Sequence, residues 1–261
     1  MKRILVTNDD GVYSDGIKAL ADAMQTLGEV TVVAPLAEAS AIGHALTLRR
    51  PLRLETIGDR VYAVDGTPTD CVNIAITSVL RGMPDLVVSG INKGWNLGDD
   101  VTYSGTVSGA FEAALLGPPG IAVSLQKTGH GFDFSEAARG AQIVAQSVLE
   151  KGLPLRTFLN INVPEGKTKG FKVTVQARRN HVTKVDERVD PRGQRYFWIE
   201  EGQNDWEPHD RSDFQAVRDG YISVTPLHLD LTHYDSLSLV EAIAARLDEA
   251  PAFETDVSKP R

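Results

Sequence analysis

The sequence predicts an α/β fold with a mostly parallel sheet, followed by an antiparallel β-hairpin extension and a C-terminal helix. Short apolar runs alternate with amphipathic helical segments through residues 2–163, the pattern of consecutive βαβ units. The first of these runs reads as a buried parallel strand, with apolar side chains on both faces. After residue 170 the alternation stops, and strand-like runs are separated by charged, irregular segments. This change in pattern predicts the extension.

The elements of the core follow in order along the chain. The first strand covers residues 2–7, and a helix follows at 15–28, where apolar residues fall on one stripe and Gly28 ends it. Another helix begins at Thr67, with Pro68 at its first position and Asp70 at its third. The remaining core elements are strands at 29–34, 85–88, 121–124 and 158–163, a hairpin at 45–64, and helices from 106 to 117 and from 135 to 150.

The C-terminal third is predicted to build the extension. Strand-like runs occupy 171–175, 196–199 and 221–224, and an amphipathic helix is predicted at 235–249. We therefore divide the chain into a core of residues 1–170 and an extension of residues 171–261 that partly completes the core. Tyr196, Phe197 and Trp198 would expose apolar area and strand edges on a monomer, which favours a homodimer or homotetramer.

Composition excludes several classes of protein. The formal net charge of -8 gives no general attraction for a nucleic acid polymer. Cys71 is the only cysteine, so no intrachain disulfide is possible and a reducing compartment is expected. The apolar run after Lys2 and Arg3 is too short for a signal peptide or a membrane-spanning helix. We expect a cytoplasmic protein without a membrane partner.

Two adjacent carboxylates, Asp9 and Asp10, follow the first strand between Asn8 and Gly11. Asn and Gly favour a turn, which would let both side chains converge at the carboxyl end of the strand, where α/β enzymes bind ligands. Two carboxylates about 4 Å apart repel by roughly 4 kcal/mol at an effective dielectric of 20, so the pair favours a bound cation. Carboxylate ligands are typical of Mg²⁺, Mn²⁺ or Ca²⁺. The alternative for these residues alone is a solvated turn.

Two later loops offer further oxygen and amide groups at the same predicted edge of the sheet. Ser40 follows the second strand, and Asn92 and Asn96 follow the strand at 85–88. Ser104, Gly105 and Thr106 then precede a helix, whose free N–H groups would suit a phosphate. The alternative for this triplet is a simple helix cap.

An ordered series of motifs in this chain resembles the SurE family, the stationary-phase survival family of metal-dependent 5'-nucleotidases. The similarity covers nearly the whole chain. The motifs are Thr7-Asn8-Asp9-Asp10-Gly11, Ala34-Pro35 with Ser40 and Gly43, Gly66-Thr67-Pro68-Thr69-Asp70-Cys71, Val88-Ser89-Gly90-Ile91-Asn92-Lys93-Gly94, Asn96-Leu97-Gly98, Tyr103-Ser104-Gly105-Thr106-Val107, and residues 159–164, 190–193 and 220–227.

The resemblance implies a Rossmann-like three-layer core with a metal site formed by Asp9, Asp10, Ser40 and Asn92. It implies one Mg²⁺ or Mn²⁺ ion per subunit and hydrolysis of nucleoside 5'-monophosphates to nucleoside and phosphate. For some members it also implies 3'-monophosphates and short polyphosphate as substrates. On this basis we expect Asp9, Asp10, Asn96 and Ser104 to be catalytic. Asn96, Ser104, Gly105 and Thr106 are expected to bind phosphate.

Two other interpretations remain open from the sequence. A non-catalytic nucleotide-binding module on a Rossmann-like core would gain little from two carboxylates facing a phosphate, whereas a phosphotransferase would pass the phosphoryl group to an alcohol instead of water. His44, beside Gly43, is interpreted as structural because no second histidine lies at a ligand spacing. The extension contains Arg178, Arg179, Arg192 and Arg195, which are interpreted as surface or interface ion-pair residues or as contacts to a neighbouring subunit's nucleotide.

Overall fold

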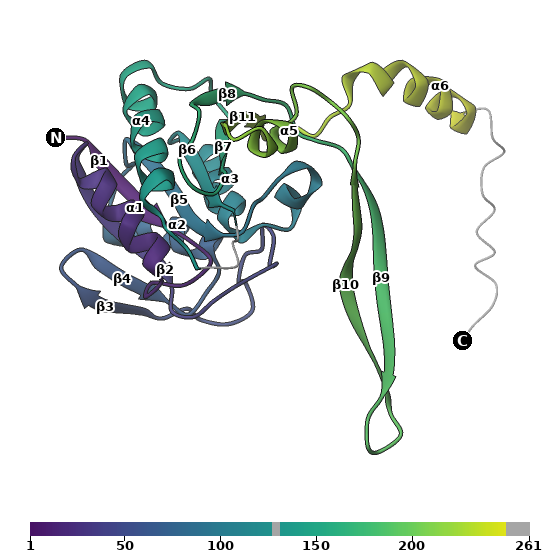
Figure 1. Cartoon of the computed structure of the whole chain (residues 1–261), viewed down its shortest axis with the longest axis horizontal. Coiled ribbons are helices and arrows are strands. Elements are labelled where there is room, and N and C mark those ends of the chain that lie inside the picture. The colour runs from purple at the N-terminus through teal and green to yellow at the C-terminus, as the bar shows by residue number, and fades with distance from the viewer. Residues whose placement is uncertain (127–130, 249–261) are drawn as a thin grey trace. The chain divides into compact units, whose positions relative to one another are not determined.

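The computed structural model describes residues 1–126 and 131–248, with the backbone alone for 179–183, 200–205 and 245–248. The chain divides into two units, Met1–Leu229 and Asp230–Arg261. The first unit contains one nine-stranded sheet, helices on both of its faces and a long β-hairpin (Figure 1). The predicted α/β class with a mostly parallel sheet and an antiparallel hairpin is confirmed.

Six parallel strands form the centre of the sheet, and their order is that of a doubly wound fold. Along the sheet they run β4 (Val61–Val64), β2 (Glu29–Pro35), β1 (Arg3–Thr7), β5 (Leu86–Lys93), β6 (Gly120–Leu125) and β7 (Thr157–Val163). From β1 the chain adds β2 and then β4 toward one edge of the sheet, and from β5 it adds β6 and then β7 toward the other edge. The order therefore reverses between β1 and β5, and the crevice outside the carboxyl ends of these two strands is where such folds bind ligands.

Helices cover both faces of this sheet, which gives the three layers (Figure 1). α1 (Asp15–Gln25) and α4 (Ser135–Lys151) pack on one face, and α2 (Pro68–Ile74) and α3 (Gly105–Leu116) on the other. In β1, Ile4 lies in the core beneath α1, and Leu5 lies in the core beneath α2, as the alternation of side chains along a strand requires. Burial on both faces explains why these strands read as continuous apolar runs.

Segments from beyond residue 170 complete the sheet. β11 (Ile222–His228) pairs antiparallel with β7, and β8 (Phe171–Val173) pairs parallel with β11. At the opposite edge β3 (Leu54–Gly58) pairs antiparallel with β4. The hairpin predicted at 45–64 is thus formed only by residues 54–64, because residues 45–53 form no strand. β5 also extends beyond its predicted end, so Asn92 lies on the strand.

The hairpin consists of β9 (Arg179–Val189) and β10 (Arg195–Trp206). Asp190 forms its turn, accepting the amide of Gly193 on its carbonyl oxygen at 2.9 Å and the amide of Arg192 on its carboxylate at 2.8 Å. A short helix follows, α5 (Asp213–Arg218). The sequence did not predict β9 or α5, since an exposed strand lacks apolar alternation and six residues are too few for helical periodicity.

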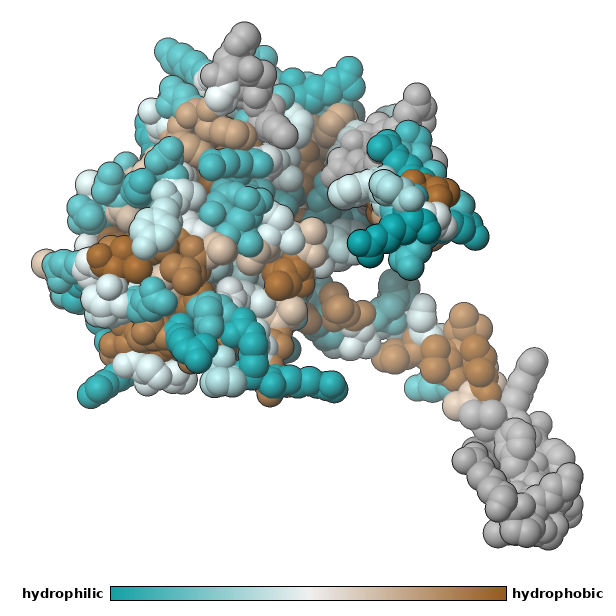
Figure 2. Space-filling view, turned by 90° about the horizontal axis from the view of Figure 1, so that it is seen from below, coloured by the Kyte–Doolittle hydropathy of each residue, from teal (hydrophilic) through white to brown (hydrophobic). Residues whose placement is uncertain are grey.

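The second unit contains the short 3-10 turn η3 (Tyr234–Ser236) and the helix α6 (Leu237–Asp248). Its predicted helix is confirmed within the described residues. Leu239, Val240 and Ile243 of α6 are 63%, 55% and 56% exposed. Figure 2 shows hydrophobic side chains gathered on this helix, which presents an apolar face within its own unit.

Candidate active site

The turn after β1 is formed by Asn8 and Gly11, as predicted. Asn8 is buried, and its side-chain amide donates to the carbonyl oxygen of Gly11 at 3.1 Å and to the hydroxyl of Ser14, the α1 N-cap, at 2.8 Å. Gly11 has a φ of +94°, a conformation that glycine adopts without strain. The loop after β2 is tied to this turn, because Ala39 donates its amide to the carbonyl oxygen of Asp9 at 2.8 Å.

Asp9 is buried against the first turn of α3. It is 6% exposed, and Thr106 donates its hydroxyl hydrogen bond to Asp9 Oδ1. Burial raises the pKa of Asp9 to about 6, with a further upward contribution from Asp10, although the bond from Thr106 opposes the increase. Gly105 permits this approach, since a Cβ there would lie 2.8 Å from the Asp9 Cβ.

Asp10 points one oxygen into a buried position without a hydrogen-bond partner. Its Oδ2 atom is buried, and no described residue donates to it. Burial raises the pKa of Asp10, and the negative charge of Glu38 raises it further. The positive charge and the backbone amide of Lys93 lower it. A buried carboxylate oxygen without a donor is costly unless a cation or a proton compensates it. The pair of carboxylates therefore fits a cation.

Ser40 lies in the loop after β2, and Asn92 lies on β5, so the two residues follow or belong to the strands that flank β1. Ser40 is exposed, and its hydroxyl donates to Glu38 Oε1 at 2.6 Å, which leaves its oxygen lone pairs available. Asn92, at the end of β5, donates from Nδ2 to the carbonyl oxygen of Gly94 at 3.0 Å, so its carbonyl oxygen Oδ1 is available as a ligand. Carboxylate, hydroxyl and amide oxygens are the donor set of a hard divalent cation.

Asn96 is held by buried polar residues that the sequence analysis did not single out. Its Nδ2 donates to Ser124 Oγ at 2.7 Å, and its backbone amide donates to Asn162 Oδ1 at 2.8 Å. Its carbonyl oxygen accepts from Asn160 Nδ2 at 2.8 Å and from Asn162 Nδ2 at 3.0 Å. The alternating sequence Leu159-Asn160-Ile161-Asn162-Val163 was a usable signal, because asparagines inside a buried strand need partners.

The Ser104-Gly105-Thr106 triplet begins α3 and lies against Asp9. Ser104 is the N-cap, and its hydroxyl accepts from the Val107 amide at 3.1 Å. That hydroxyl still has its own hydrogen to donate. The hydroxyl of Thr106 instead donates its hydrogen bond to Asp9. Only the backbone amide of Thr106 is therefore left to donate to a phosphate.

Comparison with known proteins identifies the family of this chain. Residues 4–183 match the family described as survival protein SurE. The chain belongs to the SurE family. It is 55% identical over 234 residues, 89% of this chain and 94% of the relative, to the 5'-nucleotidase SurE of Syntrophotalea carbinolica. It is 53% identical to the 5'-nucleotidase SurE of Geotalea daltonii over 92% of this chain and 98% of the relative.

Solved structures support the same family and fold. The SurE protein from Aquifex aeolicus matches with a TM-score of 0.84 and 43% identity, and the match covers 93% of this chain and 99% of that one. The Rossmann-like core with a mostly parallel sheet is therefore shared with a SurE protein whose crystal structure is known. At this identity and coverage the resemblance identified from the sequence motifs is confirmed.

In this SurE chain His44 ties the loop after β2 to the helices. Its Nε2 lies 2.6 Å from Glu112 Oε2, and its ring lies 4.5 Å from that of Phe111. Glu112 is buried, and its other oxygen accepts from Asn73 Nδ2 at 2.6 Å. These contacts fit the structural role predicted for His44.

The arginines of the extension occupy different surroundings. Arg195 bonds to Glu187 within the hairpin, and Arg192 is exposed at its turn. Arg178 lines a cavity of about 590 Å³ at the base of the hairpin, together with Asp99. The side chain of Arg179 lies outside the described residues.

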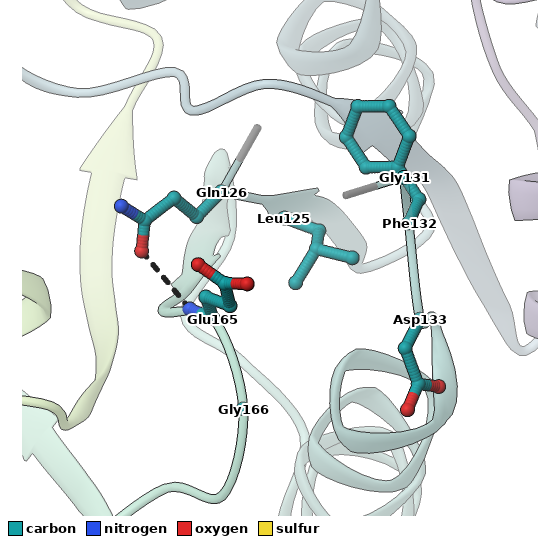
Figure 3. Close-up of a pocket in the computed structure, with 7 residues that line it drawn as sticks. All are labelled: Leu125, Gln126, Gly131, Phe132, Asp133, Glu165 and Gly166. Carbon is teal, nitrogen blue, oxygen red and sulfur yellow. Dashed lines mark hydrogen bonds between the residues drawn. The ribbon is translucent and has the colours of Figure 1, made fainter. Parts of the chain in front are cut away.

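A second cavity, of about 360 Å³, lies where β6 and β7 end (Figure 3). In it Gln126 Oε1 accepts the amide of Glu165 at 3.0 Å, and the Asp133 carboxylate accepts the amide of Ser135 at 3.0 Å. None of the predicted site residues, all of which are described, lines either cavity. The candidate site lies instead at the carboxyl ends of β1 and β5, where the strand order reverses.

Proposed function

We propose that this protein is a metal-dependent 5'-nucleotidase that hydrolyses nucleoside 5'-monophosphates to nucleoside and inorganic phosphate. The observation that carries the proposal is the Asp9–Asp10 pair at the switch point of the sheet, in which Asp9 is buried beside the N-terminus of α3 and Asp10 Oδ2 is buried without a hydrogen-bond partner among the described residues. Relatives at 55% and 53% identity bear the name 5'-nucleotidase. 3'-Monophosphates and short polyphosphate are proposed as further substrates.

We propose that Asp9, Asp10, Ser40 and Asn92 hold one Mg²⁺ or Mn²⁺ ion per subunit. The raised pKa of each aspartate and the unpartnered Asp10 oxygen fit such an ion. When bound, the ion would offset the phosphoryl charge and make a water molecule more acidic. The other steps fall to the protein's own residues.

The protein residues would hold the phosphate and move the proton. The hydroxyl of Ser104 and the amide of Gly105 would donate to phosphate oxygens at the N-terminus of α3. The amide of Thr106 and the side chain of Asn96 complete the proposed phosphate loop. A carboxylate of the Asp9–Asp10 pair would orient the attacking water and accept its proton.

We also propose an assembly and a location. The exposed Phe197, Trp198 and Ile199 of the hairpin, at 53%, 58% and 79%, and the apolar face of α6 support a homodimer or homotetramer built by residues 171–261. Residues 1–170 would form the catalytic core. In such an assembly the arginines of the extension would lie near a neighbour's nucleotide. No helix among the described residues is long and apolar enough to cross a membrane, and we propose a cytoplasmic enzyme.

The test is a phosphate-release screen. Nucleoside 5'- and 3'-monophosphates and short polyphosphate are incubated with the protein in Mg²⁺, Mn²⁺ or chelator, with and without an acceptor alcohol. We expect free phosphate from 5'-monophosphates with either metal and none with chelator. Nucleotide binding without phosphate release would instead indicate a binding module. Phosphoryl transfer to the alcohol in preference to water would indicate a phosphotransferase.

A further inference from the structure

A buried carboxylate outside the Asp9–Asp10 pair connects three parts of the chain that are distant in sequence. Asp213, the first residue of α5, is 0% exposed. Its Oδ2 accepts the amide of Gly98 at 3.0 Å, and its Oδ1 accepts the amides of Ala177 at 3.0 Å and Phe214 at 2.7 Å. Gly98 begins the 3-10 helix η2 (Gly98–Thr102) in the segment that follows Asn96, and Ala177 lies just before the hairpin.

Gly98 is held from its other side as well. Its carbonyl oxygen accepts from Gln176 Nε2 at 2.8 Å. Its φ is +52°, and a Cβ would lie 2.6 Å from the carbonyl oxygen of Ala177 and 2.8 Å from the ring of Trp206, the last residue of the hairpin. Both polar groups of one glycine are therefore bonded to the segments at the base of the hairpin.

Two aromatic residues beside this joint stack on each other. Trp206 stacks on Phe214, with ring centroids 4.6 Å apart and an interplanar angle of 10°. Phe214 is the residue after Asp213, so this stack connects the end of the hairpin to the start of α5. A stacked pair of this kind contributes about 0.5–1.5 kcal/mol beyond its buried area.

Burial raises the pKa of Asp213, opposed by the three amides that it accepts. Removing a carboxylate from water costs several kcal/mol, and only good hydrogen bonds offset this. A neutral residue could close a fold at lower cost. The arrangement instead gives the amide of Gly98 a fixed, charge-assisted acceptor.

We propose that Asp213, together with Gln176, is a positioning residue that fixes the phosphate loop to the base of the hairpin. The loop runs from Asn96 through Gly98 to Ser104. Its first residue is fixed by the asparagines of β7, and Gly98 is fixed by this joint. A displacement of the hairpin base would therefore displace the loop. The proposal rests on the proposed nucleotidase function, in which Asn96 and Ser104 meet the phosphate.

The test uses the full-length chain with Asp213→Asn and, as a second variant, Gln176→Leu. The control is Asp219→Asn, which removes a partly exposed carboxylate, paired with Lys172, just after the same helix. Amide hydrogen exchange over residues 96–104 and over β1 is measured, together with kcat and KM for a nucleoside 5'-monophosphate. We expect exchange at 96–104 to be at least about fivefold faster in both variants and unchanged over β1. We expect kcat about tenfold or more lower, because small misplacement of a positioning group has effects of this size.

The outcomes separate the joint from the nucleotidase proposal. Faster exchange confined to 96–104 supports the joint even if the wild type releases no phosphate, and in that case the nucleotidase proposal fails alone. Wild-type exchange and kcat in both variants of an active enzyme overturn the joint. Equal acceleration over β1 and the loop also overturns it, since it indicates general destabilisation. If Asp213→Asn does not fold, the exchange and kcat of Gln176→Leu decide whether the joint positions the loop.

Discussion

Thr106, in the first turn of α3, donates its hydroxyl hydrogen bond to Oδ1 of Asp9 at the end of β1. This bond turns the carboxylate toward the helix and places its Oδ2 where a Cβ at residue 105 would lie 2.9 Å away. The positive end of the α3 dipole therefore faces Asp9. The triplet before α3 thus supports a carboxylate of the proposed metal site in addition to its proposed contact with phosphate.

Thr106→Val should weaken metal binding while preserving the fold. Valine has nearly the same shape but no hydroxyl, so Asp9 loses a donor that favours its charged form. Loss of such a supporting bond typically weakens metal affinity about tenfold to a hundredfold. The Mg²⁺ or Mn²⁺ concentration for half-maximal phosphate release measures this. Thr106→Ser, which restores the hydroxyl, is the matched control, and a Val variant as sensitive to metal as the Ser variant would refute the role.

Gly105→Ala should inactivate the enzyme, because its Cβ would collide with Asp9 at 2.8 Å. Displacing the carboxylate by even about 1 Å is expected to reduce turnover roughly a hundredfold. The control is Gly58→Ala in β3, whose Cβ would meet nothing closer than 3.9 Å. Phosphate release and circular dichroism are compared for the two variants. Full activity in Gly105→Ala would show that this contact does not matter.

The contribution of Asp9 to the stability of the metal-free protein should be lost as pH rises between about 4 and 6. Burial raises the pKa of Asp9 from 3.8 to about 6 in the folded state, so in this window the folded protein keeps a proton that the unfolded chain has released. The charged, buried form at higher pH is less stable by about 3 kcal/mol. Asp9→Asn cannot lose a proton, so it isolates this contribution.

Urea denaturation of both proteins in chelator measures the effect. From pH 4.5 to 7.5 the free energy of unfolding of Asp9→Asn should increase relative to the wild type by about 2 kcal/mol. Added Mg²⁺ should remove the wild type's disadvantage at pH 7.5 by compensating the charge. A difference between the two proteins that does not change with pH would mean that Asp9 keeps an ordinary pKa.

The parts predicted from the sequence are those with a strong local signal. β1 and β2 were predicted because strands covered on both faces are continuously apolar, and the Asp9–Asp10 turn because Asn8 and Gly11 favour it. The bond from Thr106 to Asp9 was not predicted, since the sequence does not show which partner a hydroxyl meets. The joint at Asp213 connects residues 115 positions apart, a distance over which local patterns carry no information.

The protein should be at least a dimer that depends on its extension. Trp198 and Ile199 of β10 and Val240 of α6 are each more than half exposed, a large apolar area for a monomer. Light scattering is measured on the full chain, on Trp198→Glu and on a chain ending at residue 234. Asp186→Asn, a change at a charged position of the hairpin, is the control. We expect Trp198→Glu and the chain ending at residue 234 to dissociate, and Asp186→Asn to assemble as the wild type does. A fully active monomeric wild type would contradict the prediction.

The central claim is that Asp9 and Asp10 hold the metal on which phosphate release depends. The most direct measurement is turnover of a nucleoside 5'-monophosphate at saturating Mg²⁺ or Mn²⁺ by the wild type, Asp9→Asn and Asp10→Asn, with circular dichroism to confirm the fold. Loss of a charged ligand should reduce turnover by about a thousandfold or more in each variant without unfolding it. Near-normal turnover in both folded variants at saturating metal would contradict the account.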